Sequence, residues 1–213
     1  MKMVLLGPPG SGKGTRAHII SDLYGIPVVT TGDMLRGAVR EKTEYGKVAK
    51  EYMDRGDLVP NAIVNGVVRE RMSRPDVADG FILDGFPRSP EQADALDEIL
   101  SDLGTELTHV LYVVLSDDII IQRLSNRRSC PKCGAVYHLE SVQPKKAGVC
   151  DVCGAKLIQR DDDKEEVIRH RLEVYRKNTE PLLERYREKG LIVETSGEIS
   201  MDKLREHLKD ILG

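Results

Sequence analysis

The sequence has no tryptophan, only 2 phenylalanines, and no cysteine outside residues 130–153. Its charges nearly balance at a formal net charge of -3, so no overall basic field would attract nucleic acid. Long apolar runs are also absent. The first run, "MVLL", is ended by "GPPG" and is too short for a secretory segment, and no later run approaches the length of a membrane-spanning helix. These absences argue against membrane and nucleic-acid partners, and we expect a cytosolic protein.

The apolar residues that are present fall into short runs rich in β-branched side chains. With 213 residues and 40% hydrophobic content, the chain is long enough for one substantial core with small insertions. The runs are "KMVLL", "PVV", "FILD", "VLYVVL" and "LIV", and most are followed by a helical pattern. Continuous apolar strands are buried on both faces, so we expect an α/β fold with a parallel sheet and helices on both of its faces.

Two stretches do not fit the alternation of strand and helix. Residues 30–59 are helical and charged with no strand of their own, and residues 126–163 contain the cysteines and the polar turn "QPKKAG". We expect both to be insertions at the carboxyl edge of the sheet, where open α/β sheets bind ligands. The remaining residues, 1–29, 60–125 and 164–213, would then form the core.

A phosphate-binding motif follows the first predicted strand. In "LLGPPGSGKGT", Gly7, Gly12 and Lys13 have the G-x-x-x-x-G-K spacing directly before a predicted helix. The glycines let backbone N–H groups turn toward phosphate oxygens, the helix adds its positive end, and the lysine adds a charge. Residue 14 is glycine where the general motif has serine or threonine, so Thr15 is considered for the hydroxyl role beside a metal ion.

A second motif, "FILDGFPRS", ends a buried strand in Asp84. A carboxylate at this edge of the sheet could hold Mg²⁺ or its waters opposite the phosphate loop, although turn formation is the more common role of such an aspartate. Arg88 lies in the same loop. Ser89, Pro90 and Gln92 then have the positions of a helix N-cap, first helical residue and capping-box residue, which gives Gln92 a structural explanation.

Five arginines lie beside the predicted insertions and sheet-edge loops. Arg36 follows "TTGDML", Arg123 and Arg127 lie four apart on one helix, and Arg160 and Arg171 flank "DDDKEE". Each one alone is best explained as a solvated surface charge. Their joint placement predicts an anion-binding cluster.

The four cysteines form two Cys-x-x-Cys pairs, Cys130 with Cys133 and Cys150 with Cys153. In a cytosolic chain this pattern favours one structural Zn²⁺ over disulfides or redox chemistry, because four thiolates fill a tetrahedral ion and leave no open position. His138 could replace one sulfur. A nucleic-acid-binding zinc ribbon is the alternative, but such a surface needs aromatic residues, and this segment has only Tyr137.

Together, the motifs resemble the adenylate kinase family, specifically its long-lid, zinc-carrying type. The resemblance covers essentially the whole chain through "GPPGSGKGT", "TTGDMLR", "LDGFPRSPEQ", "RLSNRR", "VYH" and "QRDDD", in the family's order and spacing. It implies a P-loop NTPase-like fold that transfers the γ-phosphoryl group of MgATP to AMP, giving two ADP. Residues 30–59 would be the nucleoside-monophosphate-binding insertion and residues 126–163 the zinc-binding lid.

The resemblance also implies roles for individual residues, which follow as four sets. ATP would be bound by Gly10, Ser11, Gly12, Lys13, Gly14, Thr15 and Arg127, with Val136, Tyr137 and Ile199 beside its base. AMP would be bound by Thr31, Arg36, Asp57, Leu58, Val59, Gly85, Phe86, Pro87, Arg88, Gln92, Arg160 and Arg171. Lys13, Arg88, Arg123, Arg127, Arg160 and Arg171 would surround the transferring phosphoryl group, and Asp33 and Asp84 would anchor Mg²⁺ through water.

The chemistry of this transfer agrees with the residues present. The acceptor oxygen of AMP already belongs to an anionic phosphate, so no general base is needed. Catalysis consists of aligning two repelling anions, neutralising charge on the transferring group and excluding water. We expect a monomer with this activity. A UMP/CMP kinase, which normally has a short lid, or a guanylate-type kinase is the alternative, and GTP as the phosphoryl donor stays open.

Overall fold

The five apolar runs form one parallel sheet in a computed structural model that describes residues 1–213. The strands are β1 (Lys2–Leu6), β2 (Val28–Thr30), β3 (Phe81–Asp84), β4 (His109–Val114) and β7 (Ile192–Ser196). Their order across the sheet is β2-β3-β1-β4-β7, with Met3 of the central strand β1 in register with Ile82 and His109. The prediction of a parallel α/β sheet is therefore confirmed.

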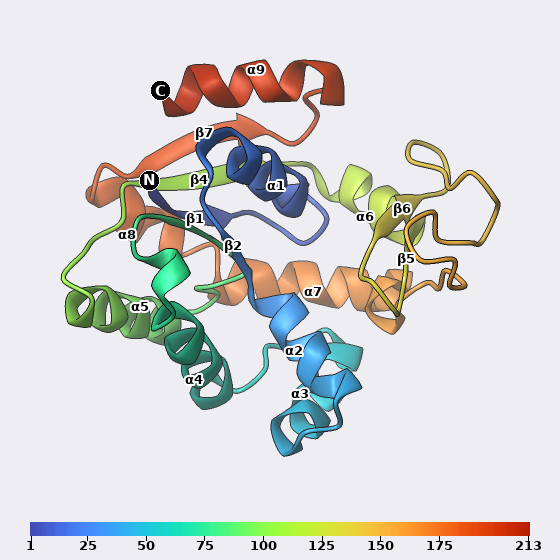
Figure 1. Ribbon diagram of the computed structural model, residues 1–213, viewed down its shortest axis with the longest axis horizontal. Coiled ribbons are helices and arrows are strands. Elements are labelled where there is room, and N and C mark those ends of the chain that lie inside the picture. The colour runs from blue at the N-terminus through green and yellow to red at the C-terminus, as the bar shows by residue number, and fades with distance from the viewer.

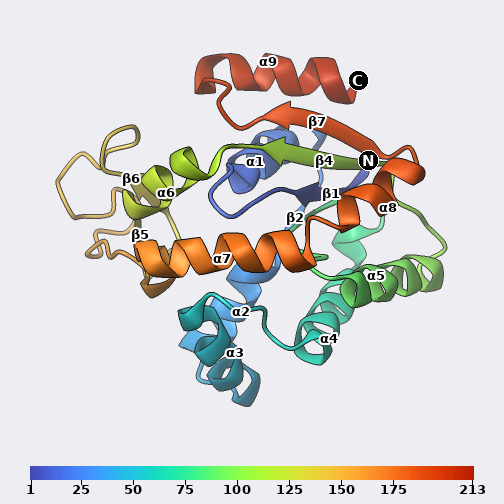
Figure 2. The ribbon, with the colours of Figure 1, turned by 180° about the vertical axis from the view of Figure 1, so that it is seen from behind.

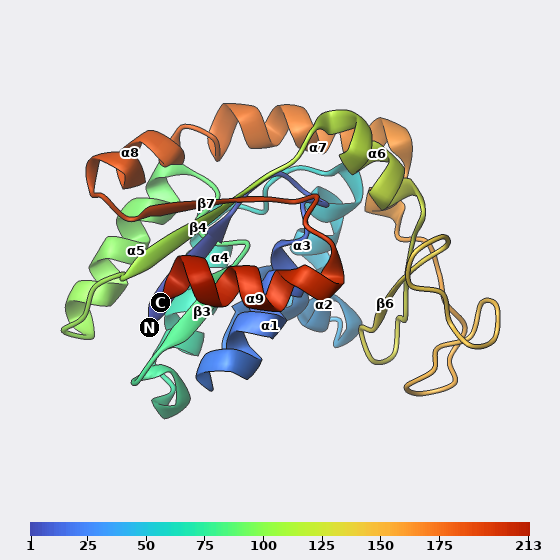
Figure 3. The ribbon, with the colours of Figure 1, turned by 90° about the horizontal axis from the view of Figure 1, so that it is seen from above.

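Helices cover both faces of this sheet. Met3 and Leu5 pack on the face covered by α1 (Lys13–Tyr24) and α9 (Met201–Leu212), whereas Val4 and Leu6 belong to the larger core on the other face. That second face is covered by α4 (Asn61–Met72), α5 (Pro90–Asp102) and α8 (Leu182–Glu188), and Figure 3 shows α8 and α9 on opposite sides of the sheet. Alternate residues of each strand thus face different cores, which explains the unbroken apolar runs. None of the helices has both the length and the apolar character needed to cross a membrane.

Residues 30–59 form a helical hairpin that leaves the sheet at the end of β2. Its helices are α2 (Thr31–Arg40) and α3 (Glu44–Arg55), which pack on each other below the sheet in Figure 1. Thr43 caps α3 by accepting a hydrogen bond from the Gly46 N–H at 3.0 Å. Gly56, in the left-handed conformation with φ +82°, ends the helix and turns the chain back toward the core.

Residues 126–163, called the cysteine segment below, project beyond α6 (Asp117–Ser125) at one side of the molecule (Figure 1). They contain the two-stranded antiparallel sheet of β5 (Arg127–Ser129) and β6 (Val136–His138), and they end in the short helix η2 (Asp161–Asp163). Ser129 and Ile158 exchange two backbone hydrogen bonds, at 2.8 and 3.0 Å, so the chain enters and leaves the segment side by side. Helix α7 (Glu165–Asn178) then leads back along the core toward α8 (Figure 2).

Candidate active site and metal centre

Most segments predicted to bind ligands begin where a strand of the parallel sheet ends. β1 runs into the phosphate loop, β2 ends directly before Thr31, β3 ends in Asp84, and β7 ends in Ser196. Because the strands are parallel, these four ends lie at one edge of the sheet. The fold thereby brings together residues that are up to about two hundred positions apart in the sequence.

The phosphate loop is shaped by close packing of its glycines. A Cβ at Gly7 would lie 2.6 Å from the Val113 carbonyl oxygen, and one at Gly10 would lie 2.8 Å from the Leu124 Cγ. Gly12 occupies the N-cap position of α1 with φ +94°, and no side chain caps the helix. The first N–H groups of α1 are therefore available to a bound anion.

Lys13 reaches back over this loop. Its Nζ donates hydrogen bonds to the carbonyl oxygens of Gly7 at 2.7 Å and Pro8 at 2.8 Å. Burial lowers the pKa of Lys13 to about 8; Asp84 opposes this decrease, while Arg88, Arg171 and Arg127 add to it. The ammonium group thus lies within the combined field of the predicted carboxylate and the predicted arginines.

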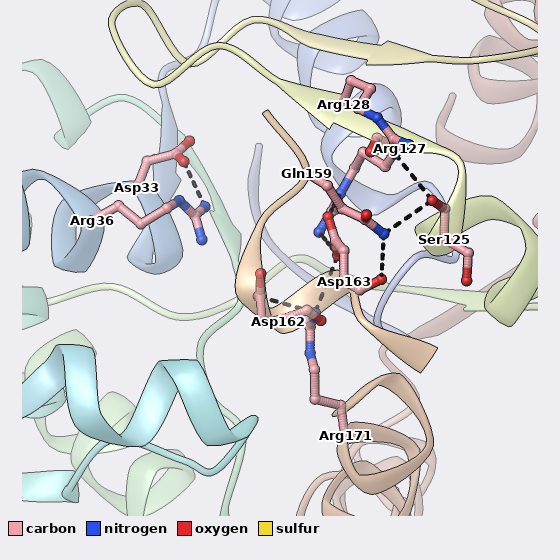
Figure 4. Close-up of polar contacts among 9 residues, drawn as sticks. All are labelled: Asp33, Arg36, Ser125, Arg127, Arg128, Gln159, Asp162, Asp163 and Arg171. Carbon is pink, nitrogen blue, oxygen red and sulfur yellow. Dashed lines mark hydrogen bonds and ion pairs between the residues drawn. The ribbon is translucent and has the colours of Figure 1, made fainter. Parts of the chain in front are cut away.

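The predicted magnesium carboxylates lie in different surroundings. A Cβ on Gly14 would lie 3.5 Å from the Asp84 Oδ2, so the Asp84 carboxylate faces the first turn of α1 and the absence of a side chain at Gly14 leaves space between them. Thr15 is exposed on the same turn. Asp33 is two-thirds exposed and forms an ion pair with Arg36 at 2.6 Å (Figure 4).

A cavity lies between the helical hairpin, the loop after β3 and the start of α7. Its lining includes these predicted residues: Thr31, Arg36, Asp57, Leu58, Val59, Gly85, Arg88, Gln92 and Arg171. It also includes residues that the motifs did not identify: Gly32, Leu35, Met53, Gly56, Val64 and Asp162. Leu35, one helical turn after Thr31, was detectable in principle from its spacing. The cavity combines an apolar part with several guanidinium groups, as a nucleotide with a phosphate requires.

Three residues of the predicted set do not line this cavity. The Phe86 side chain is fully buried in the larger core, and Pro87 follows it through a cis peptide bond. Arg160 lies at the base of the cysteine segment, just before η2. Burial lowers the pKa of Arg160 to about 10, and neighbouring Arg127 and Arg36 add to the decrease.

The Gln92 side-chain amide has one internal partner for its oxygen and one for its nitrogen. Its Oε1 accepts a hydrogen bond from the Arg88 N–H at 2.8 Å, and its Nε2 donates to the Asn61 Oδ1 at 2.9 Å. Ser89 caps α5 by accepting from the Gln92 N–H at 3.3 Å, as predicted, but the glutamine side chain binds the residue before the cap instead of the cap itself. The amide lines the cavity while its orientation is fixed by the protein.

The guanidinium group of Arg88 lies against the same loop, where its Nε donates to the Gly85 carbonyl oxygen at 2.8 Å. Burial lowers the pKa of Arg88 to about 10, and the nearby charge of Arg171 adds to the effect, while Asp84 opposes it. Arg88 and Arg171 therefore lie close enough to repel each other. An anion between them would relieve this repulsion.

Arg127 and Arg171 are held by two aspartates of η2 (Figure 4). Arg127 forms a two-pronged contact with fully buried Asp163, at 2.8 and 2.5 Å, and Arg171 contacts the Asp162 carboxylate at 3.0 Å. Burial alone would raise the pKa of Asp162, but Arg171, Arg127 and Arg160 hold it below its usual value. These pairs fix the arginines in place at the junction of the cysteine segment and α7.

Arg123 lies apart from this group. Its Nη1 donates to the Gly197 carbonyl oxygen at 3.0 Å, in the turn that joins β7 to α9. Ile199, in the same turn, is partly buried against the core beneath α1 and α9. The structure thus places Arg123 on the side of the phosphate loop where the resemblance puts the ATP base.

The four cysteines converge on one point. Cys130, Cys133, Cys150 and Cys153 place their sulfur atoms within 4.8 Å of one another, and the pairs Cys130–Cys153 and Cys133–Cys150 are 3.4 and 3.5 Å apart. A tetrahedral Zn²⁺ with four thiolates requires sulfur separations of about 3.8 Å. The donor set therefore fits one zinc ion.

Two similar turns present these sulfurs. The Cys130 N–H donates to the Ala135 carbonyl oxygen at 2.8 Å, and the Cys150 N–H donates to the Ala155 carbonyl oxygen at 2.9 Å. His138 lies outside the sulfur cluster, and its Nδ1 accepts hydrogen bonds from two backbone N–H groups of the following turn. The four sulfur atoms that could hold a metal ion cluster without it.

Tyr137 belongs to the core of the cysteine segment. Its side chain is 7% exposed and packs with Cys130, Cys150 and Leu157. The hydroxyl oxygen accepts a hydrogen bond from the Asp151 N–H at 2.8 Å and lies 3.6 Å from the Cys150 sulfur. Of the three residues expected beside the ATP base, Val136 has an exposed side chain, Tyr137 is buried and Ile199 is partly buried.

A phosphate loop with its lysine, a carboxylate opposite it and an adjoining arginine-rich cavity define a P-loop phosphotransferase with sites for two anions. A family model described as adenylate kinase matches residues 5–191. The adenylate kinase of Archaeoglobus fulgidus is 50% identical over 212 residues, covering 100% of this chain and 98% of the relative. That of Geobacillus sp. WCH70 is 49% identical over 213 residues (100% and 99%), and that of Methanosarcina mazei 46% over 212 residues (100% and 98%). The chain belongs to the adenylate kinase family.

Proposed function

We propose that the chain catalyses the reversible, Mg²⁺-dependent transfer of the ATP γ-phosphoryl group to AMP, giving two ADP. The observation that supports this most directly is the meeting of two anion sites. Lys13 of the phosphate loop lies in the field of Arg88 and Arg171, which line the neighbouring cavity. ATP on the loop and AMP in the cavity would bring their phosphates together among these cations.

In this reaction an oxygen of the AMP phosphate attacks the γ-phosphorus, and the bond to the β-γ bridging oxygen breaks. No proton has to be removed from the nucleophile. Arg88, Arg127 and Arg171, with Lys13, neutralise the charge that repels the two substrates and that spreads over the transferring group. Arg160 would complete this set from the cysteine segment, and Arg123 of α6 would join it only by exchanging its contact with the Gly197 carbonyl oxygen for the transferring group.

Mg²⁺ would be held through water by Asp84, with Asp33 as the second carboxylate, and it supplies charge neutralisation to the ATP phosphates. The Asp84 carboxylate facing the first turn of α1 supports its role. Asp33 would have to exchange its contact with Arg36 for the ion's water shell. Thr15 is the exposed hydroxyl of that turn.

The chain would divide into a core (residues 1–29, 60–125 and 164–213), an AMP-binding insertion (30–59) and a lid (126–163). The lid is the cysteine segment, and its four thiolates would hold one structural Zn²⁺ and leave no coordination position for a substrate. We expect it to close over the substrates and exclude water. Thiolates that bind metal must stay reduced, which is consistent with a cytosolic enzyme, and we expect a monomer.

Base selection is assigned to Gln92, because its amide lines the cavity in a fixed orientation and can pair with an adenine edge. The test is a coupled assay of purified protein with MgATP and AMP, UMP, CMP or GMP. We expect AMP to be preferred by at least about tenfold in kcat/KM, an energy difference of about 1.4 kcal/mol. Equal rates with UMP or CMP would contradict the preference for adenine that is assigned to Gln92. No transfer to any nucleotide would overturn the proposed function.

A further inference from the structure

Arg16, in the first turn of α1, is a buried cation without a carboxylate partner. Its side chain is only 2% exposed, and it forms no ion pair. Its Nη2 donates to the Ser196 carbonyl oxygen at 2.5 Å and its Nη1 to the Gly12 carbonyl oxygen at 3.3 Å, while its Nε has no partner. Burying an uncompensated charge is costly, so the contacts that retain it require an explanation.

The two carbonyls that Arg16 contacts belong to segments that meet only in the folded chain. Gly12 is in the phosphate loop, and Ser196 ends β7 at the start of the turn 196–199. The next carbonyl of that turn, at Gly197, accepts from Arg123. Two guanidinium groups therefore hold two successive carbonyl groups of one turn.

The turn 196–199 packs directly against the phosphate loop. A Cβ at Gly197 would lie 2.9 Å from the Ser11 carbonyl oxygen, so the two backbones are in contact there. The Gly197 N–H donates to the Val114 carbonyl oxygen at 2.7 Å, which ties the same residue to β4. The position of the turn relative to the loop is thus fixed by Arg16 and Arg123 on one side and by the sheet on the other.

We propose that Arg16 is a positioning residue for the donor nucleotide: it holds the turn 196–199 against the phosphate loop, so that the base-binding and triphosphate-binding halves of the ATP site keep a fixed separation. This inference rests on the proposed function, in which the backbone at Ile199 lies beside the ATP base. Since Arg16 is buried and its guanidinium group contacts backbone carbonyl oxygens, it would act through the turn and not by contact with the nucleotide. A rigid fork that spans two carbonyls suits this task, and a lysine with the same charge cannot reproduce it.

A second explanation is that Arg16 acts only through its charge, by attracting the triphosphate. The two explanations separate when two variants are tested against two ligands, MgATP and inorganic tripolyphosphate, which has the phosphates but no base. Arg16→Lys keeps the charge and loses the fork, and Arg16→Gln loses the charge. Arg205→Lys, at an exposed position on the following helix α9, is the matched control.

If Arg16 positions the turn, Arg16→Lys binds MgATP about tenfold more weakly, because hydrogen bonds from a charged donor are lost, and binds tripolyphosphate as the wild type does. The KM for AMP stays unchanged, and amide hydrogen exchange over residues 196–199 becomes faster. Gly197→Ala, which pushes the turn off the loop, should weaken MgATP in the same way if Arg16→Lys fails to fold. Wild-type affinity for both ligands in Arg16→Lys, or equal losses for both, would overturn the proposal. A wild-type protein that binds no MgATP would instead overturn the proposed function.

Discussion

Removing zinc should unfold the lid while leaving the AMP side of the molecule folded. The lid core has four buried residues, Cys130, Tyr137, Cys150 and Leu157, and two of these are proposed zinc ligands. Burying the tyrosine and leucine side chains contributes about 1.5–3 kcal/mol each, whereas a structural zinc site contributes about 10–16 kcal/mol in small peptides at neutral pH. Zinc binding therefore stabilises the lid more than its apolar contacts do, by about twofold or more, and the main core shares no residue with the lid core.

The assay treats the protein with a strong chelator, verifies zinc loss by metal analysis and then restores Mg²⁺. Amide hydrogen exchange of residues 130–157 should become at least about a hundredfold faster, while exchange in the sheet stays unchanged. Turnover should fall about a hundredfold or more, because the base of the lid carries Arg127, Arg160 and the buried Asp163. AMP affinity should change by less than about threefold, since the cavity is lined outside residues 130–157.

Cys133→Ser should reproduce these effects without a chelator, and Ser141→Ala, at an exposed position of the same segment, is its control. Returning zinc should restore both exchange protection and turnover to the chelated wild type. A lid whose amides stay protected after verified zinc loss would refute this reasoning. Lost turnover with an ordered, zinc-free lid would mean that the metal acts in catalysis.

Single contacts in the two sites give four further predictions. Arg88→Ala should lower kcat about a hundredfold or more at an unchanged melting temperature, because a charged contact to the phosphoryl group is lost; a folded variant with normal turnover would make this arginine structural. Gln92→Leu should lose the preference for AMP over CMP, and it should lower the free energy of unfolding by about 1–3 kcal/mol, because the Arg88 N–H loses its partner; chemical denaturation and the coupled assay measure both effects, and unchanged values would contradict them. Since the pKa of Lys13 is about 8 in the free protein, kcat/KM for MgATP should fall as pH rises above about 8 and the ammonium is lost. A pH profile that stays level to about pH 9.5 would show that the Lys13 ammonium group is not needed to bind the ATP phosphates. Tyr137→Phe should speed zinc release to a colorimetric chelator about tenfold, because the hydroxyl contact to the Cys150 sulfur is removed; a release rate equal to wild type would exclude this contact as a support of the metal site.

The parallel sheet could be predicted from the sequence because each strand is buried on both faces. Met3 and Leu5 face one core and Val4 and Leu6 the other, so the pattern is an unbroken apolar run and the strand type is unambiguous. The same pattern predicts insertions at residues 30–59 and 126–163, because both stretches interrupt it. Nothing in the pattern gave the strand order, which depends on long-range pairing such as that of β4 with β7.

The candidate site could be predicted where backbone N–H groups form it, as in the phosphate loop. It was harder to predict where the direction of a side chain decides which residues line it. Phe86 and Tyr137 lie in segments predicted to bind ligands, but both side chains turn into apolar cores. Spacing along a loop does not determine this direction, because apolar burial in the surrounding fold decides it. Arg16 was not identified for a related reason: its partner Ser196 is brought to α1 only when β7 joins the sheet.

The paired backbone hydrogen bonds between Ser129 and Ile158 join the two ends of the lid, so the residues between them form a unit that can be replaced as a whole. Since both ends of the segment meet at one rung of antiparallel sheet, everything between them can be shortened, lengthened or replaced without moving either attachment point. A two-residue hairpin turn in place of residues 130–157 would close the same rung and remove the need for metal. The proposed zinc requirement would thus be a property of what is inserted at that rung, and the phosphotransfer core could be engineered independently of it.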